Sequence, residues 1–225
     1  MKLLLTAARR LNIPFYVICH GYIHCPYLVT IAPIFSDRLF VWSDYQKQEL
    51  VEHLEASDCV SKEKVFFSGY PGDFFSRNNL LSGKRKILLL LEAFYYINQR
   101  KQVEYVRKLV SILTDSGQLT VRFHPLDREK NQFLTEIPEL NNDDIKFSDS
   151  SLSTEIENTD VIVGTNTQVL YVASLFVNHV FQVKELAMVD FEGVRSVGLS
   201  KIEYLLKQIF DKKINETLIE KKAGV

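Results

Sequence analysis

The sequence has few features that would mark a secreted, membrane-spanning or nucleic-acid-binding protein. It contains three cysteines in 225 residues, and this odd number at irregular spacing argues against a disulfide framework and favours a reducing compartment. Its formal net charge is −1, so no overall basic excess predicts a nucleic-acid partner. No apolar run approaches the roughly 18 residues of a transmembrane helix, and the apolar stretch near the N-terminus is too short for a signal peptide. We expect a cytoplasmic protein, and association with the inner face of the membrane would have to be peripheral.

One cluster of potential metal ligands occurs near the N-terminus, formed by Cys19, His20, His24 and Cys25. Structural zinc sites usually combine two separated pairs of ligands, and no second cluster follows here. The sequence therefore predicts no metal site and no cofactor.

The sequence does contain a regular alternation of apolar strands and amphipathic helices. In the second part of the chain we expect strands at 86–91, 118–123, 144–147, 160–163 and 179–183. Helices are expected at 99–116, 127–135, 152–158, 168–176 and 200–210, a loop at 92–98, and Gly117 as the C′ residue of the first helix. Alternation of this kind predicts α/β structure with a parallel, doubly wound sheet.

The first part of the chain predicts a fragment of a second α/β sheet. Strands are expected at 15–19, 38–42 and 64–68, with helices at 2–11 and 44–54. Ser43 and Gln46 have the spacing of a capping box for the latter helix. The polar stretch 77–85 has the composition of a linker. We therefore predict a partial N-terminal α/β domain at 1–76, a linker at 77–85, a C-terminal α/β domain at 86–212 and a polar tail at 213–225.

The first of two strand-to-helix corners contains His124 and Pro125, directly after an apolar strand. An imidazole at this position can donate a hydrogen bond to a phosphate, and proline suits the first turn of a helix because it lacks an N–H. The alternative is a solvated histidine before an ordinary helix start. The adjacent Arg122 is expected to face solvent.

The second corner contains Gly164, Thr165, Asn166 and Thr167, before another apolar helix. Thr165 or Thr167 can cap that helix, and free amides there can hold an oxyanion. The alternative is an ordinary threonine cap. Because ligands gather at the carboxyl ends of strands in an open α/β sheet, the two corners together predict a phosphate site for a nucleotide sugar.

Outside these corners, His20 and Gly21 end a strand of the first domain. His20 is a candidate catalytic or acceptor-binding residue, and a buried, hydrogen-bonded histidine is the alternative. Gly21, Gly69 and Gly72 are expected to serve the backbone geometry of interdomain loops.

The loop at 185–192 contains Glu185, Asp190 and Glu192. Acidic side chains bind ribose hydroxyls in several nucleotide folds, so Glu192 is a candidate donor-binding residue. Solvated acids are the alternative.

Five segments in this order resemble a family pattern: 13–22, 41–46, 69–71, 122–125 and 164–167. The pattern resembles the C-terminal two-thirds of a bacterial GT-B glycosyltransferase of the capsule or surface polysaccharide type, over residues 12–185. Polysialyltransferases, lipooligosaccharide sialyltransferases and CDP-glycerol glycerophosphotransferases are the similar groups. In such sialyltransferases a His-Pro pair and a Ser/Thr pair hold CMP, which implies donor binding by His124, Pro125, Thr165 and Thr167.

The resemblance implies metal-independent transfer of a sugar, sialic acid among the candidates, from a CMP- or UDP-linked donor to a surface glycan acceptor. Residues 1–76 would then form the acceptor side and 86–212 the donor side. The chain departs from the pattern where Asn166 separates the two threonines, and residues 1–75 contain no acidic-Gly motif for the catalytic base. A truncated or degenerate nucleotide-binding protein without catalysis and a UDP-sugar 2-epimerase-like enzyme are the alternatives.

Overall fold

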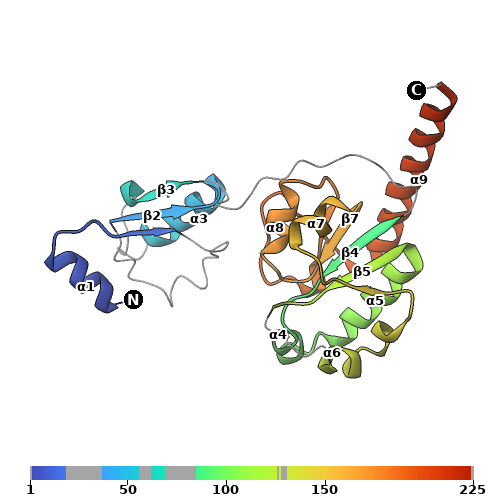
Figure 1. The fold of residues 1–225 in the computed structure, drawn as a ribbon, viewed down its shortest axis with the longest axis horizontal. Helices are drawn as coiled ribbons and strands as arrows, with labels where there is room; N and C mark the ends of the chain where they lie inside the picture. The colour runs from blue at the N-terminus through green and yellow to red at the C-terminus, as the bar shows by residue number, and fades with distance from the viewer. Residues whose placement is uncertain are drawn as a thin grey trace. The chain divides into compact units, whose positions relative to one another are not determined.

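The structure, a computed structural model, describes residues 2–18, 37–55, 62–68, 85–125, 127 and 131–223. The chain forms two compact units, Met1–Phe74 and Phe75–Val225, and Figure 1 labels elements of each. Each unit contains one parallel sheet, so the predicted α/β class is confirmed. Most of the stretch 77–85, predicted as a linker, lies outside the described residues.

The first unit contains a three-stranded sheet with the order β1-β2-β3, in which all pairings are parallel. Its elements are α1 (Lys2–Arg10), β1 (Tyr16–Ile18), β2 (Arg38–Val41), α3 (Asp44–Glu55), the 3₁₀ turn η1 (Lys62–Lys64) and β3 (Val65–Phe67).

The predicted capping box at the start of α3 is present, with one change of partner. The Ser43 hydroxyl accepts a hydrogen bond from the Gln46 N–H at 3.0 Å. The Gln46 side chain reaches back to the N–H of Trp42 at 2.9 Å, instead of the N–H of the cap residue itself.

The second unit contains a six-stranded parallel sheet with the order β6-β5-β4-β7-β8-β9. Its elements are β4 (Lys86–Leu90), α4 (Phe94–Gln99), α5 (Val103–Ser116), β5 (Gln118–Arg122), α6 (Asn131–Glu136), η2 (Pro138–Asn141), β6 (Lys146–Phe147), α7 (Leu152–Glu157), β7 (Val161–Gly164), α8 (Val169–Ser174), β8 (Val180–Val183), η3 (Lys184–Leu186), β9 (Arg195–Val197) and α9 (Leu199–Ala223).

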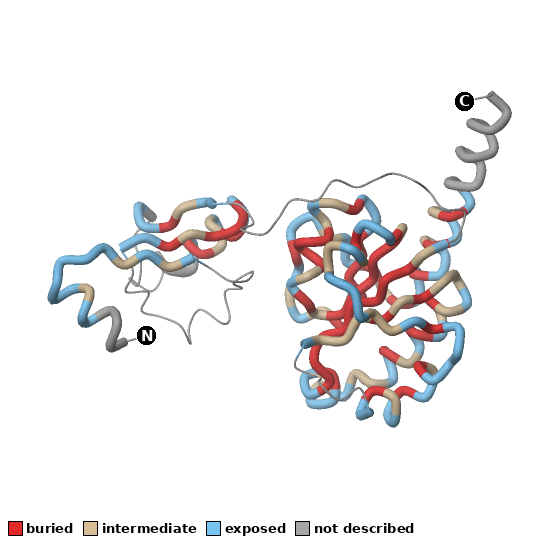
Figure 2. Tube along the Cα trace, viewed as in Figure 1, coloured by how far each residue is buried: buried red, intermediate tan, exposed pale blue. Residues whose placement is uncertain are grey.

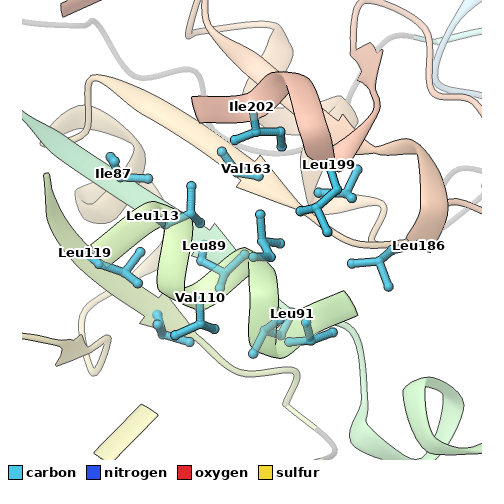
Figure 3. Close-up of a cluster of buried hydrophobic side chains, with 14 of the residues drawn as sticks. Ile87, Leu89, Leu91, Val110, Leu113, Leu119, Val163, Leu186, Leu199 and Ile202 are labelled. Atoms are coloured by element: carbon cyan, nitrogen blue, oxygen red, sulfur yellow. The ribbon is translucent and has the colours of Figure 1, made fainter. Parts of the chain in front are cut away.

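The central strands β4, β7 and β8 are mostly apolar because both faces of the sheet are covered, although Gln182 in β8 is a buried polar residue. All four residues of β7 and of β8 are buried, and Figure 2 shows buried residues concentrated along these strands. On one face, β4, β5 and β7 pack against α5 and α9, and α7 and α8 lie on the other side (Figure 1). Figure 3 shows side chains of the first face: Ile87, Leu89, Val110, Leu113, Leu119, Val163, Leu199 and Ile202.

Several details of the second unit differ from the sequence-based expectations. The expected loop at 92–98 contains the helix α4, whose first residue Phe94 is buried against Phe133, with ring centroids 4.9 Å apart. The strand β9 was not predicted. The helix expected at 200–210 runs from Leu199 to Ala223, so residues 213–223 of the predicted polar tail continue the helix.

Position 117 also requires glycine, but for a reason other than the predicted one. A C′ glycine usually has a left-handed backbone, whereas Gly117 is extended, with φ 175°. A Cβ at this position would lie 2.5 Å from the backbone oxygen of Arg85, which accepts a hydrogen bond from the Gln118 N–H at 2.7 Å. Close approach of two backbone segments, instead of helix termination, therefore requires glycine.

Within the described residues, no helix is both long and apolar enough to cross a lipid bilayer.

Candidate functional site

The strand order places a topological switch point between β4 and β7. From β4 the chain moves outward to β5 and β6, and it then returns to β7 on the other side of β4. In open α/β sheets ligands bind outside the carboxyl ends of the strands at such a point. We call residues 91–93, which follow β4, and residues 165–168, which follow β7, the switch-point edge.

Thr165 joins the two loops of this edge. Its hydroxyl accepts a hydrogen bond from the Glu92 N–H at 3.0 Å, and its own N–H donates to the Leu90 oxygen at 3.1 Å. The residue is completely buried. Thr165 therefore does not cap the following helix, as the sequence suggested, but links the ends of β4 and β7.

The start of α8 has no side-chain cap. Its N-cap residue is Gln168, which makes no side-chain cap bond, and the Thr167 hydroxyl makes only a long contact of 3.4 Å with the Val169 N–H. Among the described residues, the backbone N–H groups of Asn166 and Thr167 have no hydrogen-bond acceptor. Two amide donors are thus available at the switch-point edge.

A partly buried ion pair lies next to these amides. Glu92 is 4 % exposed, and its carboxylate pairs with the guanidinium of Arg100 and is hydrogen-bonded by the side chain of Asn166. Burial raises the pKa of Glu92 above its ordinary value of 4.5, although Arg100 and Asn166 oppose this shift. The carboxylate is therefore held in an environment that is costly for an anion.

Arg100 connects this pair to the loop that follows β8. Its guanidinium donates to the Gln102 side-chain oxygen at 2.7 Å and contacts the Met188 sulfur at 3.2 Å. Glu92 and Arg100 were not predicted as site residues. The available sequence signal was a carboxylate directly after a strongly apolar strand, which is weak because such residues are common at strand ends.

His124 lies at the carboxyl end of β5, the neighbour of β4, and is partly buried. Its backbone oxygen accepts a hydrogen bond from the Asp127 N–H at 2.9 Å. The Asp127 carboxylate in turn accepts the Phe94 N–H, at 3.2 and 3.3 Å from its two oxygens. Burial raises the pKa of Asp127, against the opposing effects of the Phe94 N–H and of His124. The hydrogen bonds of Asp127 therefore connect the corner after β5 to the start of α4.

Two expectations for this corner are corrected. Pro125 is exposed and lies in a turn, and α6 begins at Asn131, so Pro125 is not in the first turn of that helix. Arg122 does not simply face solvent, because its guanidinium donates to the Ser148 hydroxyl at 3.0 Å and to the Ser150 oxygen at 2.8 Å.

Two of the acidic residues predicted in the loop at 185–192 contact other parts of the second unit. Glu192 is exposed, and its backbone oxygen accepts a hydrogen bond from the Ser174 hydroxyl at 3.4 Å. The Glu185 carboxylate accepts the Leu199 N–H, at 3.0 and 2.9 Å from its two oxygens, and so caps α9.

Gly164 permits close packing of α8 on the sheet, since a Cβ there would lie 2.7 Å from Leu170 Cδ2. His20, Gly21, Gly69 and Gly72 lie outside the described residues.

The structure thus brings His124, Thr165 and Thr167 to one edge of the sheet, because β5 and β7 flank β4. Among the described parts of the chain, no group of three or more His, Cys, Asp or Glu side chains could hold a metal ion.

No protein-family model and no curated protein sequence matches this chain. Solved structures do match its fold. Pneumococcal O-GlcNAc transferase GtfA, in complex with UDP and GlcNAc, has a TM-score of 0.53 at 12% identity, over 98% of this chain and 48% of GtfA. Staphylococcus aureus MnaA, in complex with UDP, has a TM-score of 0.56 at 15% identity, over 92% of this chain and 62% of MnaA.

A third solved structure, UDP-N-acetylglucosamine 2-epimerase from Rickettsia bellii, has a TM-score of 0.50 at 15% identity, over 95% of this chain and 69% of the epimerase. At these identities the likeness shows the fold, which is of GT-B type, as the sequence resemblance implied. The chain spans about half of GtfA and about three fifths of MnaA.

Proposed function

We propose that the second unit binds a nucleotide-sugar donor at the switch-point edge, and that the protein is a GT-B glycosyltransferase which transfers the sugar to a glycan acceptor. The observation that carries the proposal is the pair of available amides, Asn166 and Thr167, at the switch point of a parallel sheet. Such donors suit the phosphate oxygens of a nucleotide.

The solved structures of GtfA and MnaA, which have similar folds, contain UDP. This similarity supports a nucleotide ligand for this chain. A CMP-linked donor, sialic acid as the sugar, a capsule or surface glycan as the acceptor and a role of residues 1–76 on the acceptor side are the finer parts of the proposal. They rest on the order of sequence motifs described above.

The proposed chemistry needs stabilisation of negative charge on the leaving phosphate. Preorganised amides and an imidazole can supply it without reorganisation during the reaction, so Asn166, Thr167 and His124 are the proposed groups. In this scheme the transfer proceeds without a metal ion. The acceptor hydroxyl also requires a general base, for which His20 is a candidate, and a base outside this sequence is the alternative.

The donor site is tested by calorimetry and thermal shift with CMP, CDP, UDP and GDP on the full chain and on His124→Ala. His179→Ala is the matched control, because His179 precedes β8 at the opposite, amino edge of the sheet. At a hundredfold excess over Kd, a bound nucleotide stabilises the protein by about 2.7 kcal/mol. We expect one nucleotide to bind, His124→Ala to weaken it and His179→Ala to leave it unchanged. No binding at millimolar concentration would refute the proposal.

An epimerase is the second candidate, favoured by the similarity to the Rickettsia bellii enzyme. Incubation with UDP-N-acetylglucosamine in the absence of any acceptor separates the two. An epimerase accumulates the C2 epimer of the intact nucleotide sugar, whereas a transferase requires an acceptor. Nucleotide binding without either reaction would favour the non-catalytic alternative.

A further inference from the structure

The Glu92–Arg100 pair joins three loops that lie far apart in the sequence. Glu92 follows β4, and its backbone N–H donates to the Thr165 hydroxyl after β7. Its carboxylate is bound by Arg100 and by the Asn166 side chain. The Glu92 main chain and side chain are therefore both tied to the turn at 165–168, through two different residues of that turn.

Asn166 extends the connection to the loop after β8. Its side-chain oxygen accepts the Met188 N–H at 3.2 Å, which leaves its NH₂ group as the donor to Glu92. Gln102, itself bonded to Arg100, donates to the backbone oxygen of Glu185 at 2.9 Å. The loops after β4, β7 and β8 are thus connected by side-chain hydrogen bonds around one buried charge.

Stability alone does not account for this arrangement. A buried ion pair usually stabilises a fold no better than a hydrophobic pair of similar volume, because both ions lose their hydration. The adjacent positions Leu91 and Ala93 are buried and apolar, so the loop can accommodate apolar side chains. A charged, fully bonded group is instead suited to hold neighbouring polar groups in one geometry.

We propose that Glu92, held by Arg100 and Asn166, is a positioning residue for the donor site. It fixes the turn at 165–168, which carries the two available amides, and thereby sets the affinity for the nucleotide phosphate. Arg100 has a second effect, since it neutralises a carboxylate that would otherwise repel the phosphate. This inference rests on the proposed function.

The test uses the full chain and three variants. Glu92→Gln keeps the size of the side chain and one acceptor oxygen. Glu92→Leu/Arg100→Met removes both charges together, so neither is left buried and unpaired. Glu139→Gln is the matched control, because it disrupts another Arg–Glu pair, with Arg107, between η2 and α5.

Two readouts are compared: hydrogen exchange of the amides at 164–170 without ligand, and the calorimetric Kd of the nucleotide that the wild type binds. In the double variant we expect faster exchange at 164–170, unchanged exchange in β4 and β5, and a Kd weakened on the order of tenfold or more, as for other groups that orient ligand-binding residues. Glu92→Gln should recover part of the affinity. The control should match the wild type in both readouts.

Unchanged exchange at 164–170, or an unchanged Kd in the folded double variant, would overturn the inference. Exchange that also rises throughout β4 and β5 would overturn it too, because Glu92 would then support the sheet as a whole. If the wild type binds none of the nucleotides, the proposed function fails and the positioning role fails with it. If the wild type binds and the variants bind equally well, only the positioning role fails.

Discussion

The two threonines of the β7–α8 turn should differ in their effect on stability. Thr165 is completely buried, and its hydroxyl is the acceptor for the Glu92 N–H at 3.0 Å. Thr165→Val leaves that N–H without a partner, which costs about 1–3 kcal/mol, and the added methyl group offsets at most about 0.8 kcal/mol. The Thr167 hydroxyl makes a contact of only 3.4 Å, so Thr167→Val should cost less than about 1 kcal/mol.

The assay must report on the second unit, since a chain with two units need not unfold in one step. The single tryptophan of the sequence, Trp42, belongs to the first unit, so its fluorescence serves as an internal control. Stability of the second unit is measured by hydrogen exchange of the β4 and β7 amides during urea titration. Thr165→Ser, which keeps the hydroxyl, should retain more stability than Thr165→Val. Equal destabilisation by the two valine substitutions would refute the assignment of Thr165 as the link between β4 and β7.

Three further predictions concern the second unit. Gly117→Ala and Gly117→Asn should destabilise it equally, by about 1–3 kcal/mol in urea unfolding, because any Cβ meets the Arg85 backbone; a clearly milder effect of asparagine would indicate a left-handed backbone instead. Glu185→Ala should cost about 0.5–2 kcal/mol by removing the cap on the Leu199 N–H, and an unchanged urea midpoint would contradict that role. Since the folded-state pKa of Glu92 is raised above 4.5, its contribution to stability is complete below pH 4.5 and is lost as the pH rises through the folded pKa. Glu92→Gln should therefore flatten this decline in urea midpoints measured across that window, and an unchanged slope would show that Glu92 does not cause it.

Much of the fold was accessible from local patterns. The strands β4, β7 and β8 are short, mostly apolar runs between turn signals, and their burial on both faces favours that composition whatever their neighbours are. The capping box before α3 was predicted because the spacing of Ser43 and Gln46 is a local geometric property. The helix α4 was missed because Phe94, Tyr95 and Tyr96 give a short aromatic run without clear helical periodicity. Its first residue, Phe94, packs against Phe133, nearly forty residues away, and such a contact leaves no local signal in the sequence.

For the candidate site, the sequence by itself determined that polar residues follow two apolar strands, and that His124 and the threonines lie at strand-to-helix corners. It did not determine which strands are neighbours. That depends on the order β6-β5-β4-β7-β8-β9, which places the loop after β4 beside the loop after β7. Only this pairing makes Thr165 a partner of Glu92, and only folding buries Glu92 and pairs it with Arg100. The physical reason is that hydrogen bonds and ion pairs between loops depend on the positions of strands in space, whereas strand formation depends largely on the apolar pattern along the chain.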